Sequence, residues 1–171
     1  KFFDYELKTR KEPLQLTVDT DIQFLIREEL MKFQEIFQYI GSAAILMNVN
    51  NGEILSMLSL PDFNLNKREN IQDVNYINRA TKGVYEFGSV FKTFTIAAGL
   101  NEELIEPDTE FIDLPRKIYC AGKPIGEYDN KIPSDLTVEQ ILVRSGNIGS
   151  VRIGQKIGKE KFKSFLENIG I

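Results

Sequence analysis

The chain has 171 residues, of which 42% are apolar and 27% charged, so its composition is that of a globular protein with material for about one domain. It carries 21 Lys and Arg against 25 Asp and Glu, and this net charge of −4, with mixed signs along the chain, argues against nucleic-acid binding through bulk charge. The absence of histidine excludes Ser-His-Asp and Cys-His catalysis and His-ligated metals, and the single Cys120 permits neither an intrachain disulfide nor a multi-thiolate zinc site.

A strand and a long helix are predicted near the start of the chain. Apolar and polar residues alternate over residues 14–18, which favours a short strand. The period then changes to about 3.6, and apolar residues recur at spacings of three and four over residues 21–39. Thr20 with Gln23 is a capping-box signature for the start of this helix, and Gly41 lies where a C-terminal cap belongs.

A hairpin and a connection follow. The apolar runs 43–49 and 53–60 flank Asn50-Asn51-Gly52, and an Asn-Gly step suits a tight hairpin turn. Strand, helix and hairpin together indicate an antiparallel sheet with a helix packed on one face. The periodic pattern is then lost, and residues 61–88 are predicted to form an ordered connection.

The second half of the chain predicts several shorter helices. Residues 89–100 are apolar nearly all round, so we expect this helix to be buried. Four prolines within residues 101–135 exclude long regular elements there. A capping-box signature at Thr137 opens a short helix that ends near Arg144, and residues 159–168 form the last predicted helix.

Ser89 and Lys92 form a Ser-x-x-Lys pair, which on a helix places the amine one turn from the hydroxyl on the same face. In a chain without histidine, a lysine in apolar surroundings that favour its uncharged form is a candidate base for such a serine. Backbone N–H groups at the helix start would lie where an oxyanion develops. The 8 serines and 14 lysines give about 0.65 such pairs by chance, so the pair alone leaves open a helix N-cap beside an exposed lysine.

Three longer stretches add context to this pair. Residues 78–92, NRATKGVYEFGSVFK, closely resemble the approach to the nucleophile in class B penicillin-binding proteins, the D,D-transpeptidases that cross-link peptidoglycan. Residues 41–63 are similar to the hairpin before that nucleophile, and residues 144–149, RSGNIG, are similar to the Ser-x-Asn element of the family. The resemblance extends over residues 14–171 and is closest to the septal, cell-division type.

The resemblance implies a serine acyl-transfer site. By it, Ser89 attacks the carbonyl between the two terminal D-alanines of a stem peptide, and Lys92 takes its proton. Ser145 relays a proton to the leaving D-alanine, and Asn147 holds the substrate amide. We expect Lys92 and Ser145 to converge on the Ser89 hydroxyl, with Asn147 facing the same cleft. An amine of a second stem peptide then resolves the acyl-enzyme, whereas penicillin stalls it. For Ser145-Gly146-Asn147, a helix stop followed by a new cap stays open as a purely structural alternative.

The sequence departs from the family pattern at two places. Phe87 stands where the family usually has proline before the Gly-Ser pair, which removes a fixed φ. The third family element, Lys-Thr/Ser-Gly, does not occur in the sequence and is expected beyond Ile171, so one wall of the site would be missing. Residues 1–171 alone are therefore expected to acylate slowly and to show no cross-linking. Glu86 and Arg79 match the family by context only and receive no catalytic role.

The fold implied by the resemblance is the α+β fold of penicillin-binding proteins and β-lactamases, with an antiparallel sheet and a helical subdomain, truncated before its C-terminal strands. Residues 1–171 would be part of one transpeptidase domain, comprising a strand-helix-hairpin part (14–60), the connection (61–88) and a mainly helical part with the active-site elements (89–171). No cofactor or metal is implied.

The implied partners are peptidoglycan stem peptides, β-lactam antibiotics, a cell-wall glycosyltransferase and division proteins, and nucleic acid is not among them. The implied location is the periplasmic face of the bacterial inner membrane, through an anchor segment absent from this chain. These partners and this location follow from the resemblance alone.

Two other functions remain open at this point. Serine β-lactamases share Ser-x-x-Lys and Ser-x-Asn, but they also need a positioned acid or activated lysine to bring in deacylating water. A non-catalytic penicillin-sensing or scaffold module would bind its ligand at Ser89 without turnover. The match that runs through Pro61-Asp62-Phe63 favours the transpeptidase over both.

Overall fold

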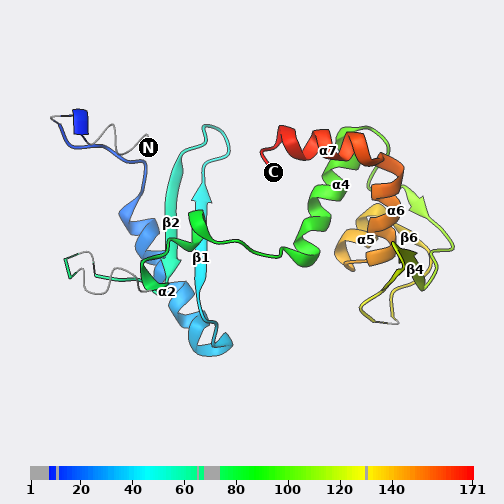
Figure 1. Cartoon of the computed structure of the whole chain (residues 1–171), viewed down its shortest axis with the longest axis horizontal. Helices are drawn as coiled ribbons and strands as arrows, with labels where there is room; N and C mark the ends of the chain where they lie inside the picture. The colour runs from blue at the N-terminus through cyan, green and yellow to red at the C-terminus, as the bar shows by residue number, and fades with distance from the viewer. Residues whose placement is uncertain (1–7, 11, 65, 68–73, 130) are drawn as a thin grey trace. The chain divides into compact units, whose positions relative to one another are not determined.

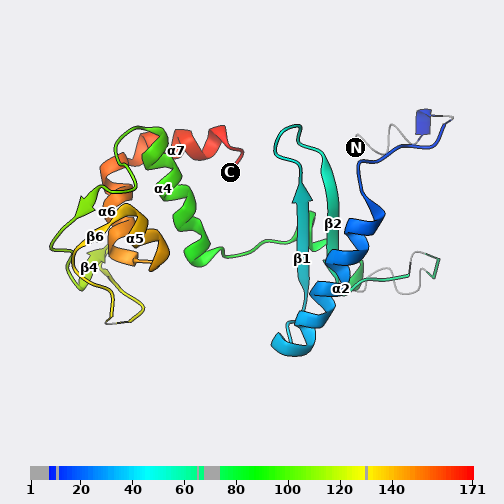
Figure 2. The same cartoon turned by 180° about the vertical axis from the view of Figure 1, so that it is seen from behind.

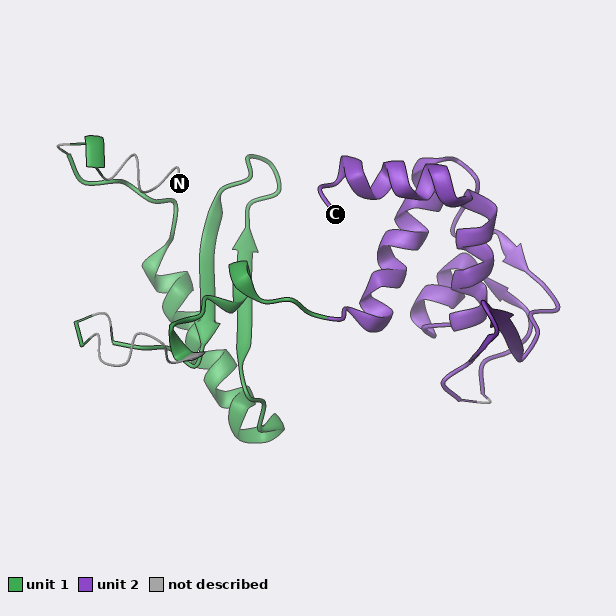
Figure 3. Cartoon of the chain, in the orientation of Figure 1, with its two compact units in different colours: residues 1–85 green, residues 86–171 purple. Residues whose placement is uncertain are grey.

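The computed structural model describes residues 8–10, 12–64, 66–67, 74–129 and 131–171 (Figure 1). The chain divides into two compact units, residues 1–85 and 86–171 (Figure 3). The boundary falls inside the expected connection 61–88, part of which lies outside the described residues. No helix in the described part is long and apolar enough to span a membrane.

The first unit is a β-hairpin with a helix packed along it. Helix α2 (Thr20–Phe37) precedes the antiparallel strands β1 (Ser42–Met47) and β2 (Ile54–Leu60). The short helices η1 (Val74–Tyr76) and α3 (Arg79–Lys82) follow. Figures 1 and 2 show α2 alongside the hairpin from opposite sides. The predicted helix and hairpin are therefore confirmed, with bounds shifted by at most two residues.

The ends of α2 differ from the sequence prediction. The N-cap is Asp19, whose carboxylate accepts hydrogen bonds from the backbone N–H groups of Asp21 and Ile22 at 2.9 and 3.0 Å. The helix ends at Gln38, which has a left-handed φ of 49°, and not at Gly41. An acidic side chain one residue earlier thus outcompetes the expected threonine cap, because its charge is favoured at a helix N-terminus.

Gln23 binds the outer edge of β2 instead of completing a capping box. Its amide donates to the Met57 carbonyl oxygen at 2.9 Å and accepts from the Met57 backbone N–H at 3.0 Å. The fully buried Ser56 hydroxyl donates to the same amide oxygen at 2.8 Å. A strand edge offers a donor and an acceptor together, so one side-chain amide satisfies both.

The strand predicted at residues 14–18 is not formed. The segment meets the same edge of β2 through two isolated hydrogen bonds, from the Thr17 hydroxyl to the Ile54 carbonyl (2.7 Å) and from the Asp19 N–H to the Leu55 carbonyl (2.9 Å). These contacts do not make a ladder, and Leu16 remains 53% exposed. Alternation predicts a strand only where a sheet offers a face to pack against.

The second unit is a cluster of helices with two short strand pairs. The 3₁₀ helix η2 (Gly88–Phe91) leads into α4 (Lys92–Asn101), followed later by α5 (Val138–Val143), α6 (Asn147–Ile157) and α7 (Lys159–Asn168). Strand β3 (Glu110–Phe111) pairs with β6 (Leu136–Thr137), and β4 (Lys117–Cys120) pairs with β5 (Lys123–Gly126), both antiparallel. The buried core consists of Ile96, Ala98, Ile105, Leu136, Val138, Ile141, Ile153 and Ile157.

The helix predicted from Ser89 has the expected position but less burial than expected. Its first turn is η2, where Val90 is 61% exposed, and the buried side chains come only from α4. The Phe91 ring lies 5.5 Å from that of Phe94 and 6.3 Å from that of Phe162 on α7. This aromatic cluster anchors the junction of η2 and α4, and hence the turn that carries Ser89.

Phe87 has a backbone φ that proline could also adopt, at the position where the family resemblance leads us to expect proline. Its φ is −67°, close to the value of about −65° that proline imposes. Phe87→Pro is therefore expected to raise the free energy of unfolding by about 0.4–1 kcal/mol, because it restricts the unfolded chain without straining the folded one. Urea denaturation of both proteins measures this change, and a loss of stability would contradict it.

Candidate active site

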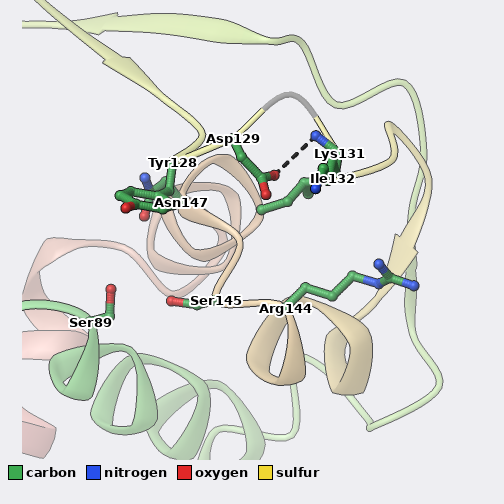
Figure 4. Close-up of a pocket in the computed structure, with 8 residues that line it drawn as sticks. All are labelled: Ser89, Tyr128, Asp129, Lys131, Ile132, Arg144, Ser145 and Asn147. Carbon is green, nitrogen blue, oxygen red and sulfur yellow. Dashed lines mark hydrogen bonds between the residues drawn. The ribbon is translucent and has the colours of Figure 1, made fainter.

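A cavity of about 570 Å³ lies in the second unit (Figure 4). Figure 4 shows the hydroxyls of Ser89 and Ser145 facing the same space, while the side chain of Arg144 extends away from it. Three of the four residues singled out in the sequence, Ser89, Ser145 and Asn147, belong to the lining. The lining residues are Ser89, Tyr128, Asp129, Lys131, Ile132, Arg144, Ser145 and Asn147.

The fourth residue, Lys92, is held by two of the other three. Its Nζ lies 2.6 Å from the backbone oxygen and 3.0 Å from the Oγ of Ser145. It also lies 2.5 Å from the Oδ1 of Asn147. Ser145 and Asn147 lie 53 and 55 positions after Lys92 in the chain, and the fold brings both to its half-buried amine.

This arrangement suits an amine that gives up its proton. As an ammonium, Lys92 donates to all three oxygens; as a free amine it donates to the two carbonyl oxygens, and the Ser145 hydroxyl can donate back to its lone pair. Deprotonation therefore costs no hydrogen bond. Burial lowers the pKa of the Lys92 amine below its ordinary value of 10.5, and the Glu127 carboxylate offsets part of that effect by raising it.

Ser89 occupies an exposed position in η2, directly after Gly88, whose φ of +54° lies in the region that favours glycine. The backbone N–H of Lys92 bonds back to the Ser89 carbonyl, so the two residues share one helical turn. Among the described residues the Ser89 hydroxyl makes no hydrogen bond, and the amine of Lys92 bonds to Ser145 and Asn147. Ser89 therefore presents an open hydroxyl to the cavity.

Ser145 closes α5 in a strained conformation. Its φ is +55°, its N–H bonds to the Leu142 carbonyl at 3.0 Å, and the Gly146 N–H bonds to the Ile141 carbonyl at 2.8 Å. This pair of bonds is a Schellman motif, in which the left-handed position is usually glycine. The structural alternative raised from the sequence, a helix stop and a new start, thus describes the backbone here, while the Ser145 side chain faces Lys92.

Ser145→Gly is expected to increase stability, because glycine adopts a positive φ without the cost of order 1–3 kcal/mol that other residues bear there. We expect a rise of about 1 kcal/mol in the free energy of unfolding, measured by urea denaturation. Ser145→Ala, which keeps a Cβ at the strained position, is the control and should give no such gain. Equal stabilities of the two variants would show that the backbone at Ser145 is not strained.

The sequence analysis missed the two residues that hold Asn147, as well as the lining residues Tyr128, Asp129, Lys131 and Ile132. Glu127 accepts hydrogen bonds from the backbone N–H groups of Asn147 and Ile148 at 2.7 and 3.0 Å, and the Gly126 carbonyl accepts from Asn147 Nδ2 at 2.7 Å. The sequence contained one signal that could have pointed to Glu127. Gly146 precedes α6 and has no side chain to cap it, so the first N–H groups of the helix need an acceptor from elsewhere in the chain.

Comparison with known proteins gives a consistent set of matches. The penicillin binding protein transpeptidase domain matches residues 42–171. The probable peptidoglycan D,D-transpeptidase FtsI of Caulobacter vibrioides is 33% identical over 160 residues, covering 93% of this chain and 27% of that protein. Stage V sporulation protein D of Bacillus subtilis is 29% identical over 158 residues, covering 92% of this chain and 24% of that protein.

A solved structure extends the similarity to three dimensions. The transpeptidase domain of Burkholderia pseudomallei penicillin-binding protein 3 is similar with a TM-score of 0.75 and 26% sequence identity. That match covers 94% of this chain and 44% of the other. The chain thus spans about a quarter of the length of the curated relatives cited above and less than half of this solved chain.

Proposed function

Because this chain belongs to the penicillin-binding-protein transpeptidase family, with the α+β fold of that family, we propose that it provides the nucleophile-bearing part of a peptidoglycan D,D-transpeptidase. The observation that carries this proposal is the placement of the Lys92 amine. It contacts Ser145 and Asn147, its pKa is lowered by burial, and it follows Ser89 by one helical turn.

In the proposed acylation step, Ser89 Oγ attacks the carbonyl carbon between the two terminal D-alanines of a stem peptide. The Ser89 proton passes to the free amine of Lys92, which acts as the base once the Ser145 hydroxyl turns away from its lone pair. The new Oγ–C bond forms and the C–N bond to the last D-alanine breaks. Backbone N–H groups at the start of η2 would donate to the oxyanion as it develops.

The leaving D-alanine needs a proton on its nitrogen, and Ser145 is suited to deliver it. Its hydroxyl touches the Lys92 amine and faces the cavity, so the proton taken from Ser89 can pass from Lys92 through Ser145 to the leaving group. Asn147 would orient the amide of the substrate. An amine of a second stem peptide then attacks the Ser89 ester, forms the cross-link and restores the hydroxyl.

The proposed substrates set the partners and the place of action. Penicillin would acylate Ser89 as the stem peptide does and remain attached. A cell-wall glycosyltransferase and division proteins are proposed partners, and the substrate places the reaction at the periplasmic face of the bacterial inner membrane. The name of the Caulobacter vibrioides relative, a probable peptidoglycan D,D-transpeptidase, supports the proposed substrate.

Mass spectrometry of the adduct with a fluorescent penicillin tests the proposal. The protein expressed from its natural gene should gain the mass of one penicillin molecule, located by peptide mapping at Ser89. The adduct should last much longer than the time in which a β-lactamase-like hydrolase completes one turnover. An adduct released at once as penicilloic acid would instead support a β-lactamase-like hydrolase. No adduct, or one at another residue, would overturn the proposal.

A further inference from the structure

The amino end of α6 is capped by a residue from outside the helix. Its N-cap, Gly146, has no side chain, and the first two N–H groups of the helix donate to the two oxygens of the Glu127 carboxylate, at 2.7 Å from Asn147 and 3.0 Å from Ile148. Glu127 is half-buried and comes directly after β5. A carboxylate at this position is doubly favoured, since it satisfies two unpaired donors and faces the positive end of the helix dipole.

The residue before Glu127 fixes the side chain of Asn147. The Gly126 carbonyl accepts a hydrogen bond from Asn147 Nδ2 at 2.7 Å, which sets the orientation of the amide and leaves Oδ1 facing the Lys92 amine at 2.5 Å. Two consecutive residues, the last of β5 and the first after it, thus hold both the backbone and the side chain of Asn147. Through Asn147 they also determine where Lys92 rests.

Glu127 is also the carboxylate whose charge acts on Lys92. Burial lowers the pKa of that amine, and Glu127 opposes the effect by raising it. The other charged side chains that line the same cavity are Asp129, Lys131 and Arg144. Removal of the Glu127 charge alone would therefore let the Lys92 pKa fall further.

We propose that Glu127 is a positioning residue for acyl transfer, whose carboxylate fixes the start of α6 so that Asn147 holds the Lys92 amine beside Ser145. This inference rests on the proposed function of Ser89 and Lys92. Glu127 itself touches no reacting atom in this scheme. Its effect reaches the chemistry through Asn147.

The test compares Glu127→Gln with Glu127→Asp in acylation by fluorescent penicillin across pH. Glutamine has nearly the same shape but offers one acceptor oxygen and no charge, so the plateau rate should fall about 10- to 100-fold through lost positioning. The limb of the pH–rate profile, meaning the pH range over which the rate rises as Lys92 loses its proton, should also move to lower pH. When the pKa of the amine falls, the free amine forms at a lower pH. Aspartate restores the charge and should return the limb to its wild-type position.

Asp19→Asn is the matched control. Asp19 also accepts two backbone N–H groups at a helix start, at 2.9 and 3.0 Å, but it caps α2 in the other unit. This variant should acylate at the wild-type rate, and the limb of its pH–rate profile should lie at the wild-type pH. If Glu127→Gln also acylates within twofold of wild type with the same limb, the inference is overturned while the proposed function stands.

A second measurement separates this inference from the proposed function. The rate at which acetic anhydride modifies the Lys92 amine, followed by mass mapping against pH, reports the amine whether or not the protein is acylated by penicillin. A lower titration midpoint in Glu127→Gln, restored in Glu127→Asp, supports the inference. An unchanged midpoint together with an acylation rate within twofold of wild type contradicts it, whereas failure of the wild-type protein to form a Ser89 adduct contradicts the proposed function.

Discussion

Ser89→Ala is expected to abolish covalent labelling of the protein by fluorescent penicillin. Alanine keeps the helical turn of η2 but removes the only atom that forms the ester, and loss of the nucleophile of a serine acyl-transfer site costs on the order of 10⁶ in rate. Because Ser89 is exposed, the free energy of unfolding should change by less than about 0.5 kcal/mol. In-gel fluorescence and intact mass measure the loss of labelling, and thermal unfolding measures the change in stability.

Ser164→Ala provides the matched control, since Ser164 is an exposed serine on α7 outside the cavity lining. It should label at the wild-type rate. Residual labelling of Ser89→Ala at the wild-type level, with the adduct mapped to another residue, would place the nucleophile elsewhere and remove the basis of the proposed mechanism.

Lys92→Met is expected to reduce the acylation rate at neutral pH by about 10² to 10⁴-fold, the usual contribution of a general base. Methionine retains the apolar stem but has no amine. The Ser145 carbonyl and Asn147 Oδ1 lose their donor, so the free energy of unfolding should fall by about 1–3 kcal/mol while the protein still folds. Stopped-flow acylation and circular dichroism measure the two effects.

The pH dependence gives this prediction a second readout. Since burial lowers the Lys92 pKa, the wild-type rate should rise with pH through a midpoint below 10.5, and Lys92→Met should lack that rise. Lys156→Met, an exposed lysine on the helix that begins at Asn147, is the control and should keep both the rate and the profile. Undiminished labelling of Lys92→Met at neutral pH would exclude Lys92 as the base.

Local patterns predicted most of the elements, and tertiary contacts decided the details that were missed. The 3.6-residue period placed α2 within one or two residues of its ends, because a helix needs only its own sequence and one face to pack. The role of Gln23 was not predictable, because its partner Met57 lies 34 residues away. The strand predicted at residues 14–18 also failed for a reason outside the local sequence: the segment makes only isolated hydrogen bonds to β2 and forms no ladder.

The candidate site shows the same division. Ser89 and Lys92 were found because both lie on one helical turn, where spacing fixes geometry. Ser145 and Asn147 came only from a family resemblance, and their approach to Lys92 depends on how α4 and α6 pack. Glu127 was missed because Gly146 indicates only that α6 needs an acceptor from elsewhere, and the sequence does not show which residue, here 20 positions earlier, supplies it.

The bonds that Gln23 and Asp19 make to β2 determine which edge of the hairpin can pair with another strand. The Leu55 carbonyl and both outward-facing backbone groups of Met57 already have hydrogen-bond partners on the α2 side, and in the described part of the chain β1 pairs with β2 alone. Strand addition is therefore one-sided: a new strand can extend the sheet along β1 without breaking any existing bond, whereas addition along β2 would first have to displace Gln23.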